Sequence, residues 1–410
     1  MRPTIYLASA ALLLAACSGE SEPAGEQAGQ NGAAEQAGAG EAAAPETAAD
    51  VLQSKDGYTL TPVAADLSVP WDMVFLPNGD MLVTERSGTI RVVRDGQLQD
   101  APVSGTPDTL VDGQGGYFSM VLDPDFASNR LLYLAFAKGT PEENTTTVIK
   151  GTLSEDASTL SDVTEIFSGT PRATTYHFGG RLAFLPDGTL IVTMGEGFRY
   201  KDEAQNPMNY HGTIARINTD GSIPEDNPFA DGADGAPAVW TYGHRNVQGL
   251  LYDEARDILW AHEHGPKGGD ELNVIRPGNN YGWPKITYGV NYDGTILTDK
   301  TEAPGMEQPV VKWVPSIAPS GMALVNSDAW SDWSGDLIVG AMNGPKGQKL
   351  VHIDLDEAGN VLGTEDLLAD LETPFRDVAF GPDGTLYVAT ANADGVIYAV
   401  TRTEDSSESE

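Results

Sequence analysis

A short pattern of alternating apolar and polar residues recurs along this chain. Each copy has two apolar runs joined by a turn, and the clearest turns read Pro-Asp-Gly or Pro-Asn-Gly. Proline presets φ at about −65° and glycine accepts positive φ, so such a turn between apolar runs predicts a β-hairpin. The clear copies occupy residues 71–84, 180–193 and 377–390, and looser copies occupy residues 118–136, 248–262 and 321–341.

Six hairpins of this kind predict radial repetition of a small antiparallel sheet. Beyond the N-terminal segment, no window keeps the apolar stripe of an amphipathic helix. We therefore predict an all-β protein, a six-bladed β-propeller over residues 53–402. Long irregular connections, which are often functional, are expected at residues 137–147, 197–211, 219–238 and 276–320.

The N-terminus indicates export. Residues 1–17 hold one arginine, an apolar run and the ending Leu14-Ala15-Ala16-Cys17, which is typical of a lipoprotein signal peptide. The run is shorter than the roughly 20 apolar residues of a membrane-spanning helix. Cys17 is the only cysteine, so an intramolecular disulfide is excluded and lipidation is favoured. We expect an exported protein, lipid-anchored in the outer membrane and facing the periplasm.

The composition of the flanking segments predicts disorder at both ends, and the overall charge excludes one class of partner. Residues 18–52 are rich in Ala, Glu and Gly and predict a disordered tether, and residues 403–410 predict a disordered acidic tail. The formal net charge is −36, with 60 acidic against 24 Lys and Arg residues. Nucleic acid is therefore not expected as a partner, because phosphate binding needs clustered cations.

Three polar segments are candidates for binding or catalysis. His177 is suited to proton transfer near neutral pH, although a lone histidine is as often structural. Arg245 lies in a His-Arg-Asn-x-Gln run, and its guanidinium suits either a bound anion or an ion pair between blades. Gln114 lies among three glycines, which allow close approach of a ligand or merely form a turn.

A loop rich in acidic residues and glycines is a candidate calcium site. Residues 263–271 combine carboxylates with free backbone carbonyls, and calcium takes six to eight oxygen ligands. Zinc is less suitable, because the loop has no cysteine and no histidine pair at helical spacing. Residues 278–284 follow closely, as a second ligand-bearing turn would.

Taken together and in this order, these motifs resemble one family. It comprises the soluble aldose sugar dehydrogenases that depend on pyrroloquinoline quinone (PQQ), relatives of soluble glucose dehydrogenase and of sorbosone dehydrogenase. The resemblance spans about residues 60–400. Its marks are GQGG at 113–116, HFGGR at 177–181, GHRNVQG at 243–249, EHGPKGGDELN at 263–273, NNYGWP at 279–284, SGMA at 320–323 and FRDV at 375–378.

The resemblance implies an enzyme with PQQ and Ca²⁺ as cofactors and a small sugar as substrate. It implies that His177 is the general base for the anomeric hydroxyl and that Arg245 lies by the quinone oxygens. The positions implied to contact PQQ are Gln114, Arg245, Asn246, Tyr292, Asn343 and Arg376. The carbonyls of Gly265 and Pro266 resemble ligands of a catalytic calcium, and Glu271 and the Tyr281 carbonyl resemble a second, structural calcium site.

Two positions depart from the family pattern. Asn343 stands where relatives have a lysine, and Pro374 stands where they have an arginine. Both cations would face the carboxylates of PQQ. Lys346 or Lys349 is a candidate replacement for the lysine, whereas the sequence shows no replacement for the arginine.

Three functions follow from this interpretation. The first is oxidation of an aldose to a lactone by hydride transfer to the quinone, with electrons passing to a separate acceptor. The second is hydrolysis, as in a calcium-dependent sugar lactonase. The third is sugar binding without turnover, by a propeller that has lost PQQ.

Overall fold

The computed structural model describes residues 49–343 and 347–403. The expected signal peptide, the lipidation site Cys17, most of the expected tether and nearly all of the acidic tail lie outside these residues. Lys346 lies outside them as well. Among the described residues, no helix has the length and apolar character needed to cross a membrane.

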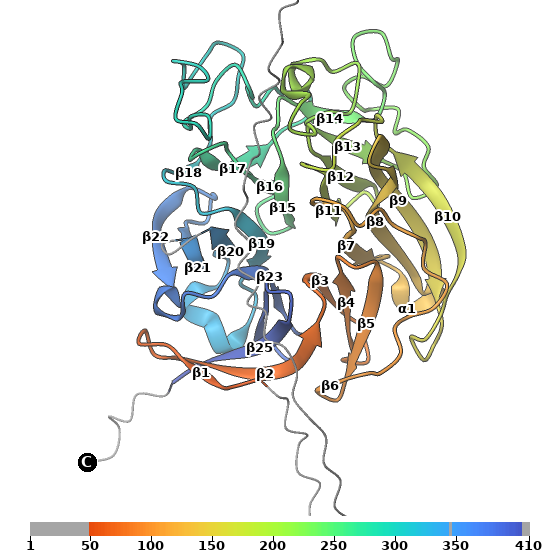
Figure 1. The fold of residues 1–410 in the computed structure, drawn as a ribbon, viewed down its shortest axis with the longest axis vertical. Coiled ribbons are helices and arrows are strands. Elements are labelled where there is room, and N and C mark those ends of the chain that lie inside the picture. Colours follow the sequence, from red (N-terminus) through yellow and green to blue (C-terminus); the bar gives the residue numbers. More distant parts are fainter. Residues whose placement is uncertain (1–48, 344–346, 404–410) are drawn as a thin grey trace, which may run out of the picture. The chain divides into compact units, whose positions relative to one another are not determined.

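The described chain forms six antiparallel sheets that follow one another around a common centre (Figure 1). From the first blade to the fifth, the strands are β3 (Pro70–Phe75), β4 (Met81–Glu85), β5 (Thr89–Arg94) and β6 (Gln97–Leu98); β7 (Tyr117–Leu122), β8 (Leu131–Thr140), β9 (Glu143–Leu153) and β10 (Leu160–Ser168); β11 (Gly179–Phe184), β12 (Leu190–Met194), β13 (Thr213–Ile217) and β14 (Val239–Tyr242); β15 (Val247–Asp253), β16 (Ile258–Glu263), β17 (Asp270–Ile275) and β18 (Val311–Trp313); and β19 (Pro319–Leu324), β20 (Leu337–Asn343), β21 (Gln348–Leu355) and β22 (Val361–Leu367). The sixth has β23 (Phe375–Phe380), β24 (Leu386–Thr390) and β25 (Gly395–Arg402), completed by β2 (Tyr58–Leu67) and β1 (Leu52–Gln53).

The six-bladed propeller predicted from the hairpin pattern is confirmed. Each predicted hairpin forms the two innermost strands of one blade; residues 71–84, for example, lie in β3 and β4. Helix is scarce, as expected: the described elements are α1 (Phe126–Asn129) and the 3₁₀ turns η1 (Lys201–Gln205), η2 (Asp328–Trp333) and η3 (Ala369–Leu371).

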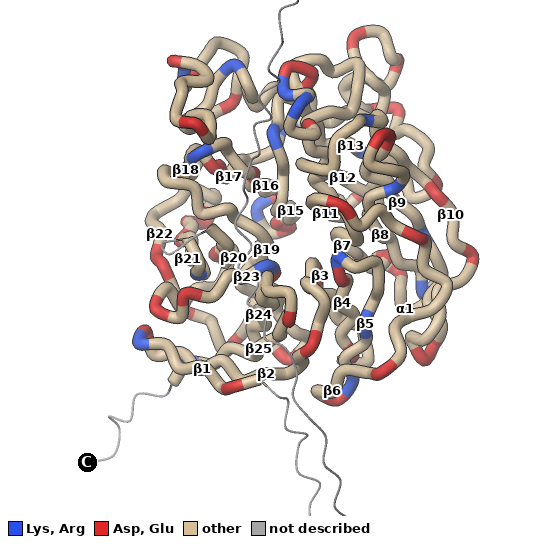
Figure 2. The backbone as a smooth tube through the Cα atoms, in the orientation of Figure 1, with Lys and Arg blue, Asp and Glu red and all other residues tan. Residues whose placement is uncertain are grey.

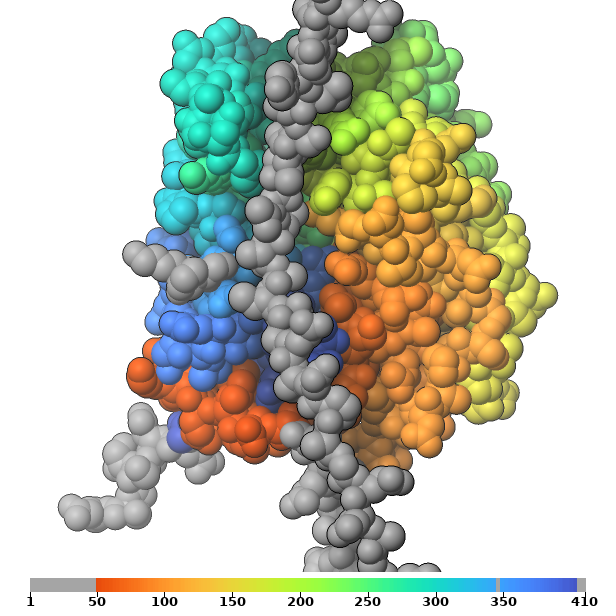
Figure 3. Space-filling view, viewed as in Figure 1, coloured from red at the N-terminus to blue at the C-terminus, as the bar shows by residue number. Residues whose placement is uncertain are grey.

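The ring is closed by a strand from the opposite end of the chain. Strand β2 pairs antiparallel with β25, so the sixth sheet joins N-terminal and C-terminal segments. In Figure 3 the red-orange N-terminal segment accordingly lies beside the blue C-terminal blade. β1 begins at Leu52, the last residue of the range expected to be a tether. The main-chain hydrogen bonds between β2 and β25 therefore hold the two ends of the ring together.

One expected irregular connection is wrong. Residues 137–147 continue β8 and β9 as a long hairpin, paired as far as Thr140 opposite Glu143. The run from Thr145 to Ile149 is β-branched throughout, which favours a strand over a loop. Residues 197–211 and 219–238 are irregular apart from η1. The connection expected at 276–320 is without a strand only as far as residue 310, because β18 and the first residues of β19 lie within its last part.

All six innermost strands share a break in register near their first residues. The shift falls, for example, between Pro70 and Asp72 in β3, between Val247 and Gly249 in β15, and between Phe375 and Asp377 in β23. The other three strands, β7, β11 and β19, shift at the corresponding place. A bulge redirects side chains and strengthens the local twist. Polar residues at the starts of these strands therefore reach the central channel.

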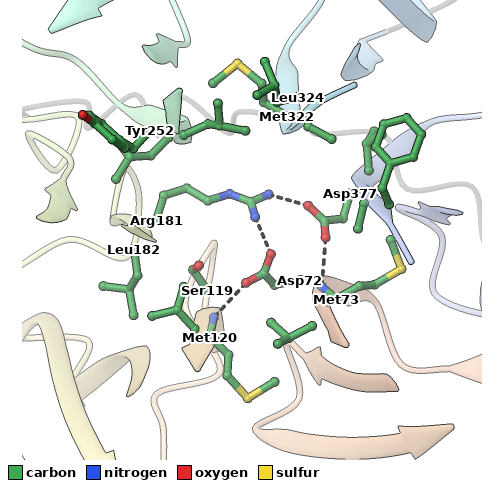
Figure 4. A pocket seen from close by; sticks show the side chains of 18 of the residues that line it. Asp72, Met73, Ser119, Met120, Arg181, Leu182, Tyr252, Met322, Leu324 and Asp377 are labelled. Atoms are coloured by element: carbon green, nitrogen blue, oxygen red, sulfur yellow. Dashed lines mark hydrogen bonds and ion pairs between the residues drawn. The ribbon is translucent and has the colours of Figure 1, made fainter. Parts of the chain in front are cut away.

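A buried ion-pair cluster crosses the channel. Figure 4 shows Arg181 of β11 between two carboxylates, at 2.5 Å from Asp72 of β3 and 3.0 Å from Asp377 of β23. The same carboxylates accept backbone N–H bonds from Met120 and Met73. One cluster thus ties blades one, two, three and six together. It lines a cavity of about 760 Å³.

The distribution of charged residues agrees with the acidic composition of the chain. Acidic positions are spread around the periphery of the blades in Figure 2, and basic positions are fewer. The apolar residues pack mainly between neighbouring blades, as where Leu82 and Ile90 of blade one meet Leu132 and Leu134 of blade two. Packing between blades is what fixes the geometry of the central channel.

Candidate functional site

His177 is held by a buried glutamate. Its Nδ1 lies 2.9 Å from Oε1 of Glu196, and both side chains are almost fully buried. The backbone N–H of His177 donates to Oε1 of Gln114 at 2.8 Å. Glu196 therefore fixes the orientation of the ring and leaves Nε2 for a ligand. The structure brings the predicted residues His177 and Gln114 into direct contact.

The backbone at His177 adopts an unusual conformation. His177 has φ of +51°, a left-handed conformation that costs energy for a residue other than glycine. Gly195 packs against it so closely that a Cβ there would lie 1.9 Å from the His177 carbonyl oxygen. Only glycine fits at that place, and it allows the loop that carries Glu196 to approach the ring.

Burial shifts the pKa of both residues of the His177–Glu196 pair. Burial, followed by the charges of Arg245, His264 and Arg172, lowers the pKa of His177 well below its ordinary value. Burial also raises the pKa of Glu196 to about 7, against the opposing effect of Arg245 and Arg172. Near neutral pH the first proton taken up by the pair therefore resides on Glu196, and the imidazole is neutral.

Arg245 is positioned by an acidic residue from the neighbouring strand. Its backbone N–H donates to Oε2 of Glu263, while Oε1 of Glu263 lies 2.8 Å from Nδ1 of His244. Its side chain donates to the His264 carbonyl and to the Tyr292 hydroxyl, each at 3.2 Å. Among the described residues the Arg245 guanidinium forms no ion pair with a carboxylate. Its charge is thus available to an anionic ligand.

A second unpaired guanidinium lies in a cavity of about 210 Å³ beside the channel. Arg376 is buried and donates to Oε1 of Gln248 at 3.0 Å, and its guanidinium carbon lies 4.2 Å from the centre of the Trp71 ring. Its Nε has no hydrogen-bond partner in the described structure. Burial, then the charge of Arg181, lowers the pKa of Arg376 to about 9. Gln114 and Asn246 line the same cavity.

The predicted calcium carbonyls lie next to this cavity. Gly265, Pro266, Tyr292 and Asn343 together line a neighbouring cavity of about 770 Å³. His264 lines both spaces. Hence most of the residues that the family resemblance singled out line two adjoining cavities.

The expected structural calcium residues also lie together. Glu271 and Tyr281 line a small space that also includes Glu263 and Arg245. Burial and the charge of Glu263 raise the pKa of Glu271 to about 8. Within residues 49–343 and 347–403, no three or more His, Cys, Asp and Glu side chains are arranged to hold a metal. A cation here would therefore need backbone oxygens among its ligands.

One proposed substitute for the missing family lysine is wrong. The Lys349 ammonium lies 2.6 Å from Asp366 of β22, because its strand, β21, is one of the outer strands of blade five. Asn343 itself donates from Nδ2 to the Ser316 carbonyl at 3.1 Å. Position 343 holds a neutral side chain and the Lys349 ammonium is paired with Asp366, so the cation of the family lysine is replaced by neither residue.

Several residues of the site had no assigned role in the sequence analysis. Glu196 and Arg172 flank His177, and Arg172 is buried with Nε and Nη2 unpartnered in the described structure. The Phe198 ring lies 5.3 Å from the His177 ring and is 46% exposed. The only sequence signal was an acidic residue between two glycines at the end of an apolar strand, at residues 195–197.

The fold and site thus define a β-propeller with a carboxylate-supported histidine beside a cationic cavity. The family model for glucose/sorbosone dehydrogenase matches residues 67–399. Aldose sugar dehydrogenase YliI of Escherichia coli K12 is 39% identical over 366 residues, covering 87% of this chain and 94% of the relative. This chain belongs to the glucose/sorbosone dehydrogenase family.

Two solved structures extend the comparison. The apo form of the soluble aldose sugar dehydrogenase of E. coli has a TM-score of 0.80 and 37% identity, covering 84% of this chain and 99% of that one. The PQQ-bound aldose sugar dehydrogenase of Streptomyces coelicolor has a TM-score of 0.70 and 29% identity, with 84% and 97% covered. The family and these relatives support an oxidoreductase that acts on sugars.

Proposed function

We propose that this protein is a PQQ- and calcium-dependent dehydrogenase that oxidises the anomeric carbon of aldose sugars to lactones. The observation that carries the proposal is the buried His177–Glu196 pair beside a cavity with an unpaired Arg376. Membership of a sugar dehydrogenase family supports the substrate class.

The residues of the chain would manage the proton and the position of the sugar. Glu196 accepts a hydrogen bond from Nδ1–H, so Nε2 is free to take the proton of the anomeric hydroxyl. Arg245 lies close enough to His177 to disfavour its charged form, which keeps the base neutral before reaction. Phe198 and Tyr292 expose aromatic surface beside the base, and exposed apolar surface of this kind suits a ligand.

The cavity fits PQQ on its own chemistry. A buried guanidinium without a carboxylate partner, such as that of Arg376, destabilises the folded protein unless a bound anion balances its charge. PQQ carries carboxylates, and the amides of Gln114 and Asn246 add hydrogen-bonding groups at the cavity wall. Arg245, Asn246, Gln114 and Arg376 would hold the cofactor. When bound, PQQ supplies the acceptor for the hydride of the anomeric carbon.

The oxygen-rich loop suits calcium. Gly265 and Pro266 would contribute carbonyl oxygens to a calcium at the cofactor, and Glu271 with the Tyr281 carbonyl would contribute to a structural calcium. A hard divalent cation favours neutral and anionic oxygen donors of this type. The buried carboxyls of Glu263 and Glu271, which share one small space, would both be stabilised by a nearby cation.

Calorimetric titration of PQQ into the purified chain tests the proposal. With Ca²⁺ present we expect saturable binding near one PQQ per chain, and with a chelator we expect binding to weaken by about tenfold or more, as for loss of a charged contact. An absence of binding under both conditions would reject the dehydrogenase. Hydrolysis of sugar lactones without PQQ would then favour the lactonase, and sugar binding without turnover would favour a non-catalytic propeller.

The pH dependence of kcat/KM should have its acid limb near pH 7. Protonated Glu196 donates to Nδ1, which moves the ring proton to Nε2 and removes the base. Activity should therefore fall as pH drops through about 7, the raised pKa of Glu196. Glu196→Gln cannot gain this proton, so its acid limb should move to lower pH, toward the lowered pKa of His177. An unmoved limb would contradict this assignment.

We also propose an export route and an electron partner. The residues up to Cys17 support a lipid anchor in the outer membrane, facing the periplasm, which fractionation of cells expressing the full chain would test. Electrons would leave to a separate acceptor, because the sequence contains no haem-attachment motif.

A further inference from the structure

A residue of blade one faces the same cavity as Arg376. Arg86 follows the end of β4 and is partly buried, and it lines the cavity together with Gln114, Gln248 and Arg376. Its charge is one of those that disfavour the charged form of Arg376. The two cations thus come from blades one and six, which are neighbours only because the ring closes.

Neither arginine is neutralised by the described protein. Arg86 forms no ion pair with any described carboxylate, and the adjacent Glu85 lies 3.7 Å from Arg91. Asp72 and Asp377, the carboxylates whose charges act on Arg376, are paired with Arg181. Two like charges at one cavity repel each other, and an anion bound between them would offset that repulsion.

The side chain of Arg86 is accommodated by a glycine of the GQGG motif. A Cβ on Gly116 would lie 2.6 Å from Cγ of Arg86 and 2.1 Å from its carbonyl oxygen. Gly116 also has φ of +143°, which favours glycine. The motif therefore does more than place Gln114: it makes room for the stem of Arg86 at the cavity wall.

We propose that Arg86 and Arg376 form a two-arginine subsite for a ligand that bears at least two carboxylates. This inference rests on the proposed function, in which that ligand is PQQ. Each planar guanidinium can bind one carboxylate through two parallel N–H bonds. Arg86 would then provide, from blade one, the cation that Pro374 does not provide next to β23. Although Pro374 replaces an arginine of the family, this change by itself would then leave the number of cations at the site the same.

The test is the affinity of PQQ for the calcium-loaded protein, measured by calorimetry without any sugar. Arg86→Gln should weaken binding about 10- to 100-fold, as expected for loss of a charge-assisted contact. Arg86→Lys keeps the charge but loses the two parallel N–H bonds, so it should weaken binding by less than Arg86→Gln does. Arg94→Gln, which removes an equal charge paired with Asp80 away from the cavity, should leave affinity unchanged.

The outcomes separate this inference from the proposed function. If the parent protein binds no PQQ, the proposed function fails. If the parent binds PQQ and Arg86→Gln binds it equally well, the two-arginine subsite is wrong while the proposed function stands. Equal weakening in Arg86→Gln and Arg86→Lys would mean that the charge at residue 86 contributes nothing, and it would overturn the role of Arg86 as a replacement cation. Thermal unfolding without PQQ verifies that each variant is folded.

Discussion

Replacing His177 by alanine is expected to lower kcat for PQQ-dependent oxidation of an aldose by about 10²- to 10⁴-fold, the usual contribution of a general base. The reason is that Nδ1 is committed to Glu196 and Nε2 is the only ring atom placed to take a proton. Stopped-flow reduction of a dye at saturating sugar measures the change.

The affinity for PQQ should change little in this variant, because the cofactor contacts proposed here come from other side chains. His352→Ala is a matched control, since His352 also pairs with a buried carboxylate, Asp336, at 2.7 Å but lies in blade five outside the site cavities. It should keep full kcat. A His177→Ala variant that turns over sugar as fast as the parent would show that the base lies elsewhere.

Replacing Arg181 by methionine is expected to destabilise the protein by about 3–5 kcal/mol, the range for breaking a buried ion pair from one side. The variant would leave Asp72 and Asp377 buried without their common cation, and it would remove the guanidinium that lies 4.3 Å from the Trp71 ring. Urea unfolding at pH 7 measures the loss.

The pH dependence of this loss has a definite sign. Burial already raises the pKa of Asp377 to about 7, and without Arg181 the folded state would favour the protonated acid still more. When the pKa of a carboxyl is higher in the folded than in the unfolded state, the folded protein becomes less stable as pH rises. The deficit should therefore be smaller at pH 5 than at pH 8.

An exposed ion pair provides the control for Arg181. Lys138 pairs with Glu165 at 2.5 Å, but both side chains are largely exposed, so Lys138→Met should cost about 0–1 kcal/mol. If Arg181→Met cost no more than this control, the central cluster would not be what joins the blades around the channel.

The repeat pattern was sufficient to predict the architecture. Alternation of apolar residues and the turn chemistry of Pro-Asp-Gly act over a few residues, so six hairpins could be recognised without any knowledge of how they pack. The motifs then marked His177, Gln114 and Arg245 as candidates, and the structure places them in one region. The irregular connection expected at residues 137–147 was wrong, because the β-branched residues 145–149 favour a strand.

What the sequence by itself determined is therefore local: the hairpins, their number, and the residue types suited to the site. The tertiary structure alone decided which segments meet. It placed Glu196 against His177, Lys349 toward Asp366 and away from the cavity, and Arg86 beside Arg376. These pairings depend on the bulges of the inner strands and on closure of the ring by β2, where residues far apart in the chain become neighbours. Local propensity carries no information about such contacts, because they form only when the blades pack around a common channel.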